Sequence, residues 1–152
     1  MSTQKRFIPE AEARDILERG FAGVLSTTSP DGRPYGVPVN YCYSGEENCV
    51  FFHCAKEGRK IGNILFNPQV SFLVVGPYEV LPEKITTRYE SVMVSGTAAI
   101  VSGPDEKAEK LRALCAKFAP DSPWARDGSL PCGDSLIVKI GIECVTGKRN
   151  PG

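Results

Sequence analysis

The chain has 152 residues, with 18 basic and 18 acidic side chains and a formal net charge of +0. A hydrophobic share of 41% and a charged share of 24% are typical of a globular protein, and the length suits a single domain over residues 1–152. The balanced charge argues against a general nucleic-acid binder, which carries a basic excess, but it leaves room for one local cationic pocket.

Targeting and metal-binding signals are absent from the sequence. No apolar run approaches the roughly 18 residues that cross a membrane, and residues 1–20 lack the apolar core of a secretion signal, so we expect a cytoplasmic protein. The six cysteines form no CxxC pair, and one histidine is too few for a zinc site with mixed ligands. We therefore expect reduced thiols, most of them buried as small hydrophobes, and no metal.

The first half of the chain reads as one helix followed by three strands. Residues 9–19 predict a helix, with Pro9 at its first position and acidic residues in its first turns. Residues 21–28 and 35–43 predict a hairpin around the turn sequence SPDGRP, and Pro38 places the second arm at an edge or a bulge. Residues 49–54 predict a third strand.

The middle of the chain changes from strand to helix and back. Residues 58–67 have helical apolar spacing, and Pro68 ends that helix because a residue before proline disfavours the helical conformation. Residues 70–76 are a nearly continuous apolar strand, and residues 91–101 are another, with a bulge or a close approach expected at Gly96.

The last third predicts a helix, a long loop and a strand. Residues 104–118 form the helix. Its predicted apolar face consists of Ala108, Leu111, Cys115 and Phe118. Residues 119–134 are rich in turn-forming residues but include Trp124, which argues against simple disorder, and we expect this loop to cover a site. Residues 135–146 form the last strand, followed by a basic tail.

These elements define a mainly β protein. The short turns between the early strands favour antiparallel pairing. Six such strands with three helices close best as a small barrel with helices over its open ends.

The strongest local signal is residues 51–64, FFHCAKEGRKIGNI, where a strand meets a helix. The first N–H groups of a helix lack intrahelical partners and carry the positive end of its dipole, so they suit a phosphate. Arg59 and Lys60 would add charged contacts, and Gly58 would let the backbone approach the anion closely. The alternative is a solvated surface turn, and local sequence alone does not decide between the two.

Other candidate sites are weaker. His53, the only histidine, is a candidate catalytic residue or a structural residue at the end of a strand. The polar residues 86–91, TTRYES, form either the rim of a site or an exposed edge. The aromatic residues around positions 41–52 either stack on a ring or pack in the core.

Four segments follow one another in the order GVLSTTSPDGRPYGVPVNYCY, VFFHCAKEGRKIGNILFNPQVSFLVV, TTRYESVMVSGTAAIV and VKIGIECVTGK. In this order they resemble the flavin-binding split-barrel group related to pyridoxamine 5′-phosphate oxidase. The similarity runs from about residue 7 to residue 148 and is greatest to the nitroimidazole-resistance (Nim-type) subgroup. It implies a six-stranded Greek-key split barrel that binds FMN in a groove between the two subunits of a homodimer.

The resemblance also implies a set of cofactor-binding residues. Arg59 and Lys60 would hold the FMN phosphate, with Gly58 allowing its close approach. The other implied contacts are His53, Cys54 and Ala55 in the phosphate pocket, Val39, Asn40 and Tyr41 beside the ring and ribityl chain, and Ser91 near the flavin.

The implied function is an FMN-dependent oxidoreductase that passes electrons to a small organic acceptor, with a nitroaromatic compound as one candidate and a nicotinamide nucleotide as the donor. The chain ends in TGKRNPG and lacks the Arg-rich ending of true pyridoxamine-phosphate oxidases, which argues against vitamin B6 oxidation. Two alternatives remain: a non-catalytic flavin carrier or sensor, and an unrelated small-barrel binding module. We expect no nucleic-acid partner and no membrane association.

Overall fold

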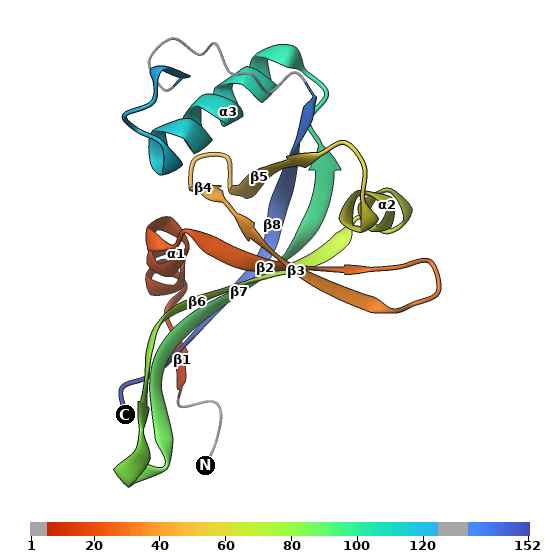
Figure 1. Ribbon diagram of the computed structural model, residues 1–152. Coiled ribbons are helices and arrows are strands. Elements are labelled where there is room, and N and C mark those ends of the chain that lie inside the picture. The colour runs from red at the N-terminus through yellow and green to blue at the C-terminus, as the bar shows by residue number, and fades with distance from the viewer. Residues whose placement is uncertain (1–5, 125–133) are drawn as a thin grey trace.

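The computed structural model describes residues 6–124 and 134–152. Figure 1 shows strands that pass through the centre of the molecule with helices packed around them. The elements are β1 (Phe7–Ile8), α1 (Glu10–Arg19), β2 (Ala22–Thr28), β3 (Pro34–Asn40), β4 (Cys42–Ser44), β5 (Cys49–Ala55), α2 (Arg59–Phe66), β6 (Gln69–Leu81), the 3₁₀ turn η2 (Pro82–Lys84), β7 (Thr86–Ile100), α3 (Pro104–Phe118) and β8 (Ser135–Asn150).

All strand pairs are antiparallel, in the order β3-β2-β6-β7-β8-β5-β4, with β1 added on β8. The six predicted strands are all present. The prediction of one strand over residues 35–43 was wrong in one respect, because the chain divides there into β3 and β4 on either side of Tyr41.

This division at Tyr41 closes the barrel. β3 pairs with β2 at one end of the strand order, whereas β4 pairs with β5 at the other end. A single residue therefore carries the chain from one edge of the sheet to the other, and β3 also approaches β5. A mainly β split barrel with flanking helices is thus confirmed. Pro38 lies on the edge strand β3, as predicted.

Several boundaries differ from the predicted ones. Pro9 precedes α1 as its N-cap, and α2 begins after Gly58. β6 and β7 are longer than the predicted strands, and the two form an arm that projects from the barrel in Figure 1. The polar residues 86–91 belong to this arm, as part of β7. The expected irregularity at Gly96 is confirmed by a register shift between Ser95 and Gly96.

Two clusters of buried side chains make up the core. The larger lies inside the barrel and includes Phe52, Phe72 and Val94. The smaller joins α3 to the outer face of β4, β5 and β8, and it includes Phe51 and Leu111. Cys42, Cys49 and Cys54 are buried thiols in these clusters, as expected.

The face of α3 that contacts the barrel is rotated from the predicted one. Leu111 is buried as expected, but the other buried residues are Leu114 and Lys110. Lys110 is buried because its ammonium lies 4.9 Å from the Phe51 ring centroid and 2.5 Å from a Glu47 carboxylate oxygen. The spacing of apolar residues does not predict that Lys110 is buried, because the carboxylate that pairs with it, Glu47, lies far away in the sequence.

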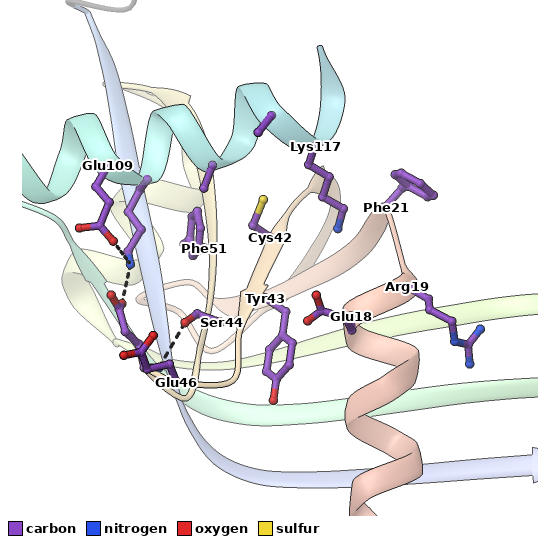
Figure 2. Close-up of a pocket in the computed structure, with 14 residues that line it drawn as sticks. Glu18, Arg19, Phe21, Cys42, Tyr43, Ser44, Glu46, Phe51, Glu109 and Lys117 are labelled. Atoms are coloured by element: carbon purple, nitrogen blue, oxygen red, sulfur yellow. Dashed lines mark hydrogen bonds and ion pairs between the residues drawn. The ribbon is translucent and has the colours of Figure 1, made fainter. Parts of the chain in front are cut away.

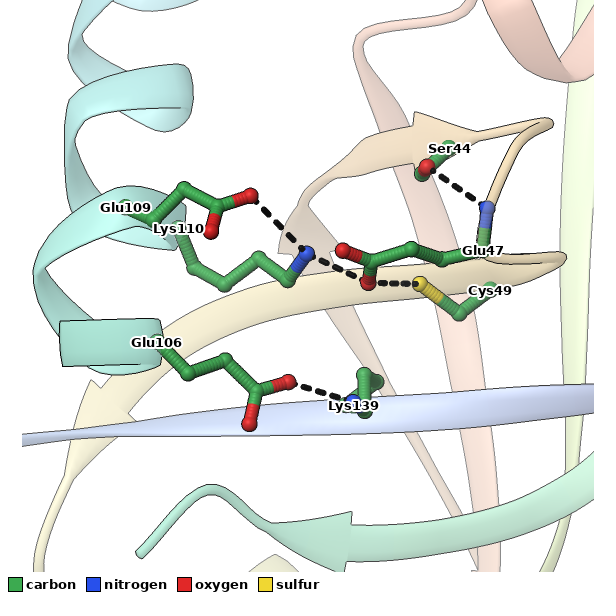
Figure 3. Close-up of polar contacts among 7 residues, drawn as sticks. All are labelled: Ser44, Glu47, Cys49, Glu106, Glu109, Lys110 and Lys139. Carbon is green, nitrogen blue, oxygen red and sulfur yellow. Dashed lines mark hydrogen bonds and ion pairs between the residues drawn. The ribbon is translucent and has the colours of Figure 1, made fainter. Parts of the chain in front are cut away.

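Glu47 connects several polar groups beneath α3, as Figure 3 shows. Its carboxylate also accepts a hydrogen bond from the Cys49 thiol at 3.6 Å, and Lys139 pairs with Glu106 close by. The hydrogen bond from Lys110 lowers the pKa of Glu47. A carboxyl whose folded-state pKa is lowered stabilises the fold above its unfolded pKa, and this stabilisation is lost as the pH falls through the folded pKa.

Glu47→Ala will lower the free energy of unfolding at neutral pH by about 2 kcal/mol, because it leaves the Lys110 ammonium buried without its carboxylate. This figure is below that for a fully buried pair because the Glu47 side chain is 38% exposed. Lys110→Met removes the buried charge and will cost under about 1 kcal/mol. Chemical denaturation of both variants measures the difference, and equal losses would contradict this role of the pair.

One face of the barrel remains open in the described part of the chain. Along β2 and β7, side chains alternate between the core and this face. Val24, Val75 and Met93 project from the open face, with exposed fractions of 39%, 52% and 39%. An apolar sheet face of this kind is typical of an interaction surface.

Candidate functional site

The turn between β5 and α2 places the predicted residues 53–60 at one end of the barrel. Cys54 projects into the core, whereas His53 and Ala55 are exposed on the opposite side of the strand. Burial raises the pKa of the Cys54 thiol, against the opposing effect of the Lys60 charge. Cys54 is therefore a protonated thiol at neutral pH, and it is not an activated nucleophile.

The N-terminus of α2 has the features of an anion site. Gly58 has φ 136°, a conformation that favours glycine, and it turns the chain into the helix. The first helical hydrogen bond runs from the Gly62 N–H to the Gly58 carbonyl at 3.1 Å, so the preceding N–H groups have no intrahelical acceptor. No side chain of residues 6–124 or 134–152 caps this end, and its first turn contains no acidic residue.

Arg59 and Lys60 add positive charge to these free N–H groups. Within residues 6–124 and 134–152, neither forms an ion pair with a carboxylate. Two cations at the positive end of a helix dipole interact unfavourably with that dipole unless an anion is bound between them. A bound phosphate would offset this repulsion, and the phosphate interpretation of the turn stays a prediction.

Arg59 faces a second element that was not predicted to take part. Its guanidinium lies 5.0 Å from the centroid of the Tyr35 ring on β3. A buried hydrogen bond of 2.9 Å from Asn63 on α2 to Thr27 on β2 holds the helix against this hairpin. The contact between Arg59 and Tyr35 joins positions far apart in the sequence. The sequence predicted the hairpin from its turn SPDGRP, but not the approach of this hairpin to Arg59.

The exposed edge of β3 leads away from Arg59. Among the described residues β3 pairs only with β2, so its other edge offers backbone polar groups from Pro34 to Asn40 over about 20 Å, except for the N–H that Pro34 and Pro38 lack. Val39 packs toward the core and Asn40 is exposed. The Tyr41 side chain is fully buried, and its hydroxyl donates to the Leu17 carbonyl at 2.6 Å. Its backbone N–H donates to the Phe21 carbonyl at 3.2 Å and its carbonyl accepts from Lys117, so within one chain Tyr41 presents no free group to a ligand.

Ser91 lies apart from the phosphate end within one chain. It pairs with Val75 on β6, and its side chain shares the open face with Asn40. Two strands separate β7 from β3, which puts Ser91 about 14 Å from Asn40, and Arg59 is farther still. A single chain does not bring Ser91 to the other predicted site residues.

A larger pocket begins where β3 ends. Its volume is about 720 Å³, and α1, the β4–β5 hairpin and α3 form its walls (Figure 2). Phe21, Cys42 and Phe51 give it apolar surface, and Glu18, Glu46 and Glu109 lie around it. Sequence analysis did not identify this pocket, since its residues come from segments far apart in the chain.

Lys117 is the cation at the barrel end of this pocket. Its ammonium donates to the carbonyls of Gly20 and Tyr41, at 2.5 and 2.9 Å, and lies 4.5 Å from the Tyr41 ring centroid. Burial lowers its pKa, although Cys42 and Glu18 act in the opposite direction. Lys117 thereby fixes the end of β3 and β4 against α3.

The predicted covering loop is described only in part. Trp124 is 42% exposed at the end of the first described range, and residues 125–133 lie outside the described residues. The covering role of this loop stays a prediction.

The fold defines a split-barrel protein in which a helix end that carries two cations lies beside a strand edge. A family model described as pyridoxamine 5′-phosphate oxidase matches residues 9–149, so the chain belongs to that family. No curated protein matches the chain. None of the helices in the described ranges has the length and apolar character to cross a membrane.

Three solved structures illustrate the shared fold. A candidate 5-nitroimidazole antibiotic resistance protein from Bacteroides thetaiotaomicron is 22% identical with a TM-score of 0.76, over 93% of this chain and 85% of that one. An FAD-binding protein from Mesorhizobium loti is 23% identical with a TM-score of 0.66, over 95% of this chain and 97% of that one. An FAD and heme binding protein from Mycobacterium smegmatis is 16% identical with a TM-score of 0.77, over 99% of this chain and 73% of that one. The family match and these structures confirm the resemblance found in the sequence.

Proposed function

We propose that the chain binds a flavin through the phosphate of its FMN moiety and acts as a flavin-dependent oxidoreductase. The observation that carries the proposal is the N-terminus of α2, where free N–H groups meet the open edge of β3 and two cations have no carboxylate partner among the described residues. Membership of the family and the flavin-binding proteins among the similar folds support it.

Each part of this site has its own task. Arg59, Lys60 and the N–H groups after Gly58 hold the phosphate, and His53 and Ala55 lie beside it as the outer wall. The edge of β3, with Val39 and Asn40, supports the ribityl chain and the ring, and the buried Tyr41 fixes the end of this strand. Bound flavin supplies the redox chemistry, while the protein binds and orients it. No protein acid or base is assigned to the reaction.

The partner in this proposal is a second copy of the chain. Ser91 shares the open apolar face with Asn40 and lies far from Arg59. Covering that face with a second copy buries Val24, Val75 and Met93, and it brings Ser91 of one subunit toward the β3 edge of the other. The site is incomplete without this homodimer.

The electron acceptor would occupy the 720 Å³ pocket that begins beyond Tyr41, because this is the end of β3 assigned to the ring. Its volume and partly aromatic lining suit a small organic molecule, of which a nitroaromatic compound is one candidate. The donor we propose is a nicotinamide nucleotide.

Anaerobic mixing of the flavin-loaded protein with NADH or NADPH tests the enzymatic proposal. We expect the flavin absorbance to be lost and then restored when a nitroaromatic acceptor is added. Bound flavin that neither nucleotide reduces, or that no acceptor reoxidises, would instead assign the chain to the carriers or sensors.

A further inference from the structure

A smaller pocket lies directly beyond the proposed phosphate site, on the side away from the flavin ring. It has a volume of about 310 Å³ and is lined by Ser29, Asp31, Arg33, Pro34, Tyr35 and Arg59. Arg59 lines this pocket and also begins α2, so the pocket is continuous with the phosphate site. A group attached to the flavin phosphate would enter it.

The β2–β3 turn holds the far wall of this pocket in place. The Ser29 N–H donates to the Arg33 carbonyl at 2.9 Å, and the Arg33 N–H donates to the Ser29 hydroxyl at 3.1 Å. Gly32 has φ 81°, which lets the chain reverse within this turn. Arg33 and Asp31 are therefore presented by an internally bonded turn.

The side chains of the pocket match the parts of an adenylate group. Arg33 and Arg59 offer forked donors to a second phosphate, and Arg33 keeps unused N–H groups although it pairs with Asp31 at 3.2 Å. That ion pair also neutralises the Asp31 charge, while the carboxylate can still accept hydrogen bonds from ribose hydroxyls. The Arg59 guanidinium lies 5.0 Å from the Tyr35 ring centroid, so a base would stack on the part of the ring that Arg59 leaves uncovered.

We infer that this pocket takes the adenylate half of FAD, so that the chain binds FAD more tightly than FMN. The inference rests on the proposed flavin site, because the FMN half must lie along β3 with its phosphate at Arg59. Arg33, Asp31 and Tyr35 then determine which flavin is selected.

Isothermal titration of the flavin-free dimer with FMN and with FAD tests this inference. We expect the FAD dissociation constant to be about tenfold lower than that of FMN, which corresponds to a few added contacts. Asp31→Ala and Arg33→Ala should each raise the FAD dissociation constant about fivefold and change that of FMN by less than about twofold. Lys60→Ala, which touches only the shared phosphate, should weaken both flavins.

Three results would overturn the inference while leaving the flavin site intact. The first is an FMN affinity equal to or greater than that of FAD, and the second is an equal effect of the hairpin variants on both flavins. The third is tight binding of AMP to the FMN-loaded protein that Arg33→Ala abolishes, which would assign the pocket to a separate nucleotide. Failure of both flavins to bind is a different outcome, since it would overturn the proposed function itself.

Discussion

Replacement of both Arg59 and Lys60 by alanine will weaken flavin binding about 1000-fold and leave the fold intact. A hydrogen bond to a charged group contributes about 1.5–3 kcal/mol, so the loss of two phosphate contacts costs about 4 kcal/mol. Neither side chain forms an ion pair with a carboxylate in the described ranges, and both oppose the dipole of α2. The variant also loses the contact of Arg59 with the Tyr35 ring, so the melting temperature of the flavin-free protein should change by no more than a few degrees.

Flavin titration and thermal melting of this double variant measure the two expectations separately. Lys84→Ala combined with Arg112→Ala removes the same two residue types from exposed positions on η2 and α3, and it should leave flavin affinity unchanged. If the Arg59 and Lys60 double variant binds flavin as tightly as this control, the phosphate assignment is wrong.

Lysine substitutions at Val24 and Met93 will separate the proposed dimer and reduce flavin affinity at least about 100-fold. Both side chains are 39% exposed on the open face of one chain, so lysine is tolerated in the folded subunit. In a two-fold interface, the four added ammonium groups are desolvated without partners, which strongly opposes association. Loss of the second copy also removes its Ser91 from the site.

Sedimentation velocity across a range of protein concentrations, together with flavin titration, measures this coupling. Asp121→Lys is the matched control, because one substitution adds the same two units of positive charge at an exposed position beyond α3. A Val24 and Met93 variant that is monomeric yet binds flavin normally would show that one chain contains the complete site.

The fold followed from sequence wherever burial imposes a repeating pattern. The continuous apolar run of β6 follows from covering its strand, and it predicted the strand correctly. In β2 the burial alternates with period 2, but the sequence AGVLSTT does not, and this strand was predicted from its β-forming residues and the turn that follows. The arm formed by the ends of β6 and β7 has no such pattern, since residues such as Glu79 and Val80 are exposed alike. The break at Tyr41 was equally hidden, because β3 and β4 pair with different partners although their residues read as one run.

The local half of the site could be predicted, but its tertiary half could not. Gly58, Arg59 and Lys60 are consecutive, and a helix N-terminus has the same free N–H groups in any fold. The contact of Tyr35 with Arg59 and the hydrogen bond of Asn63 with Thr27 both join α2 to the β2–β3 hairpin, and no sequence pattern reveals either. For the same reason, the distance between Ser91 and Arg59 within one chain became apparent only from the strand order.

The most direct test of the account is the amount of flavin bound by the purified protein. After incubation with excess FMN or FAD and gel filtration, we predict that flavin absorbance coelutes with a dimer at one flavin per chain. The melting temperature should also rise with flavin concentration, as linkage requires of a ligand that binds only the folded state. A colourless protein whose melting temperature neither flavin raises would contradict the flavin site at α2.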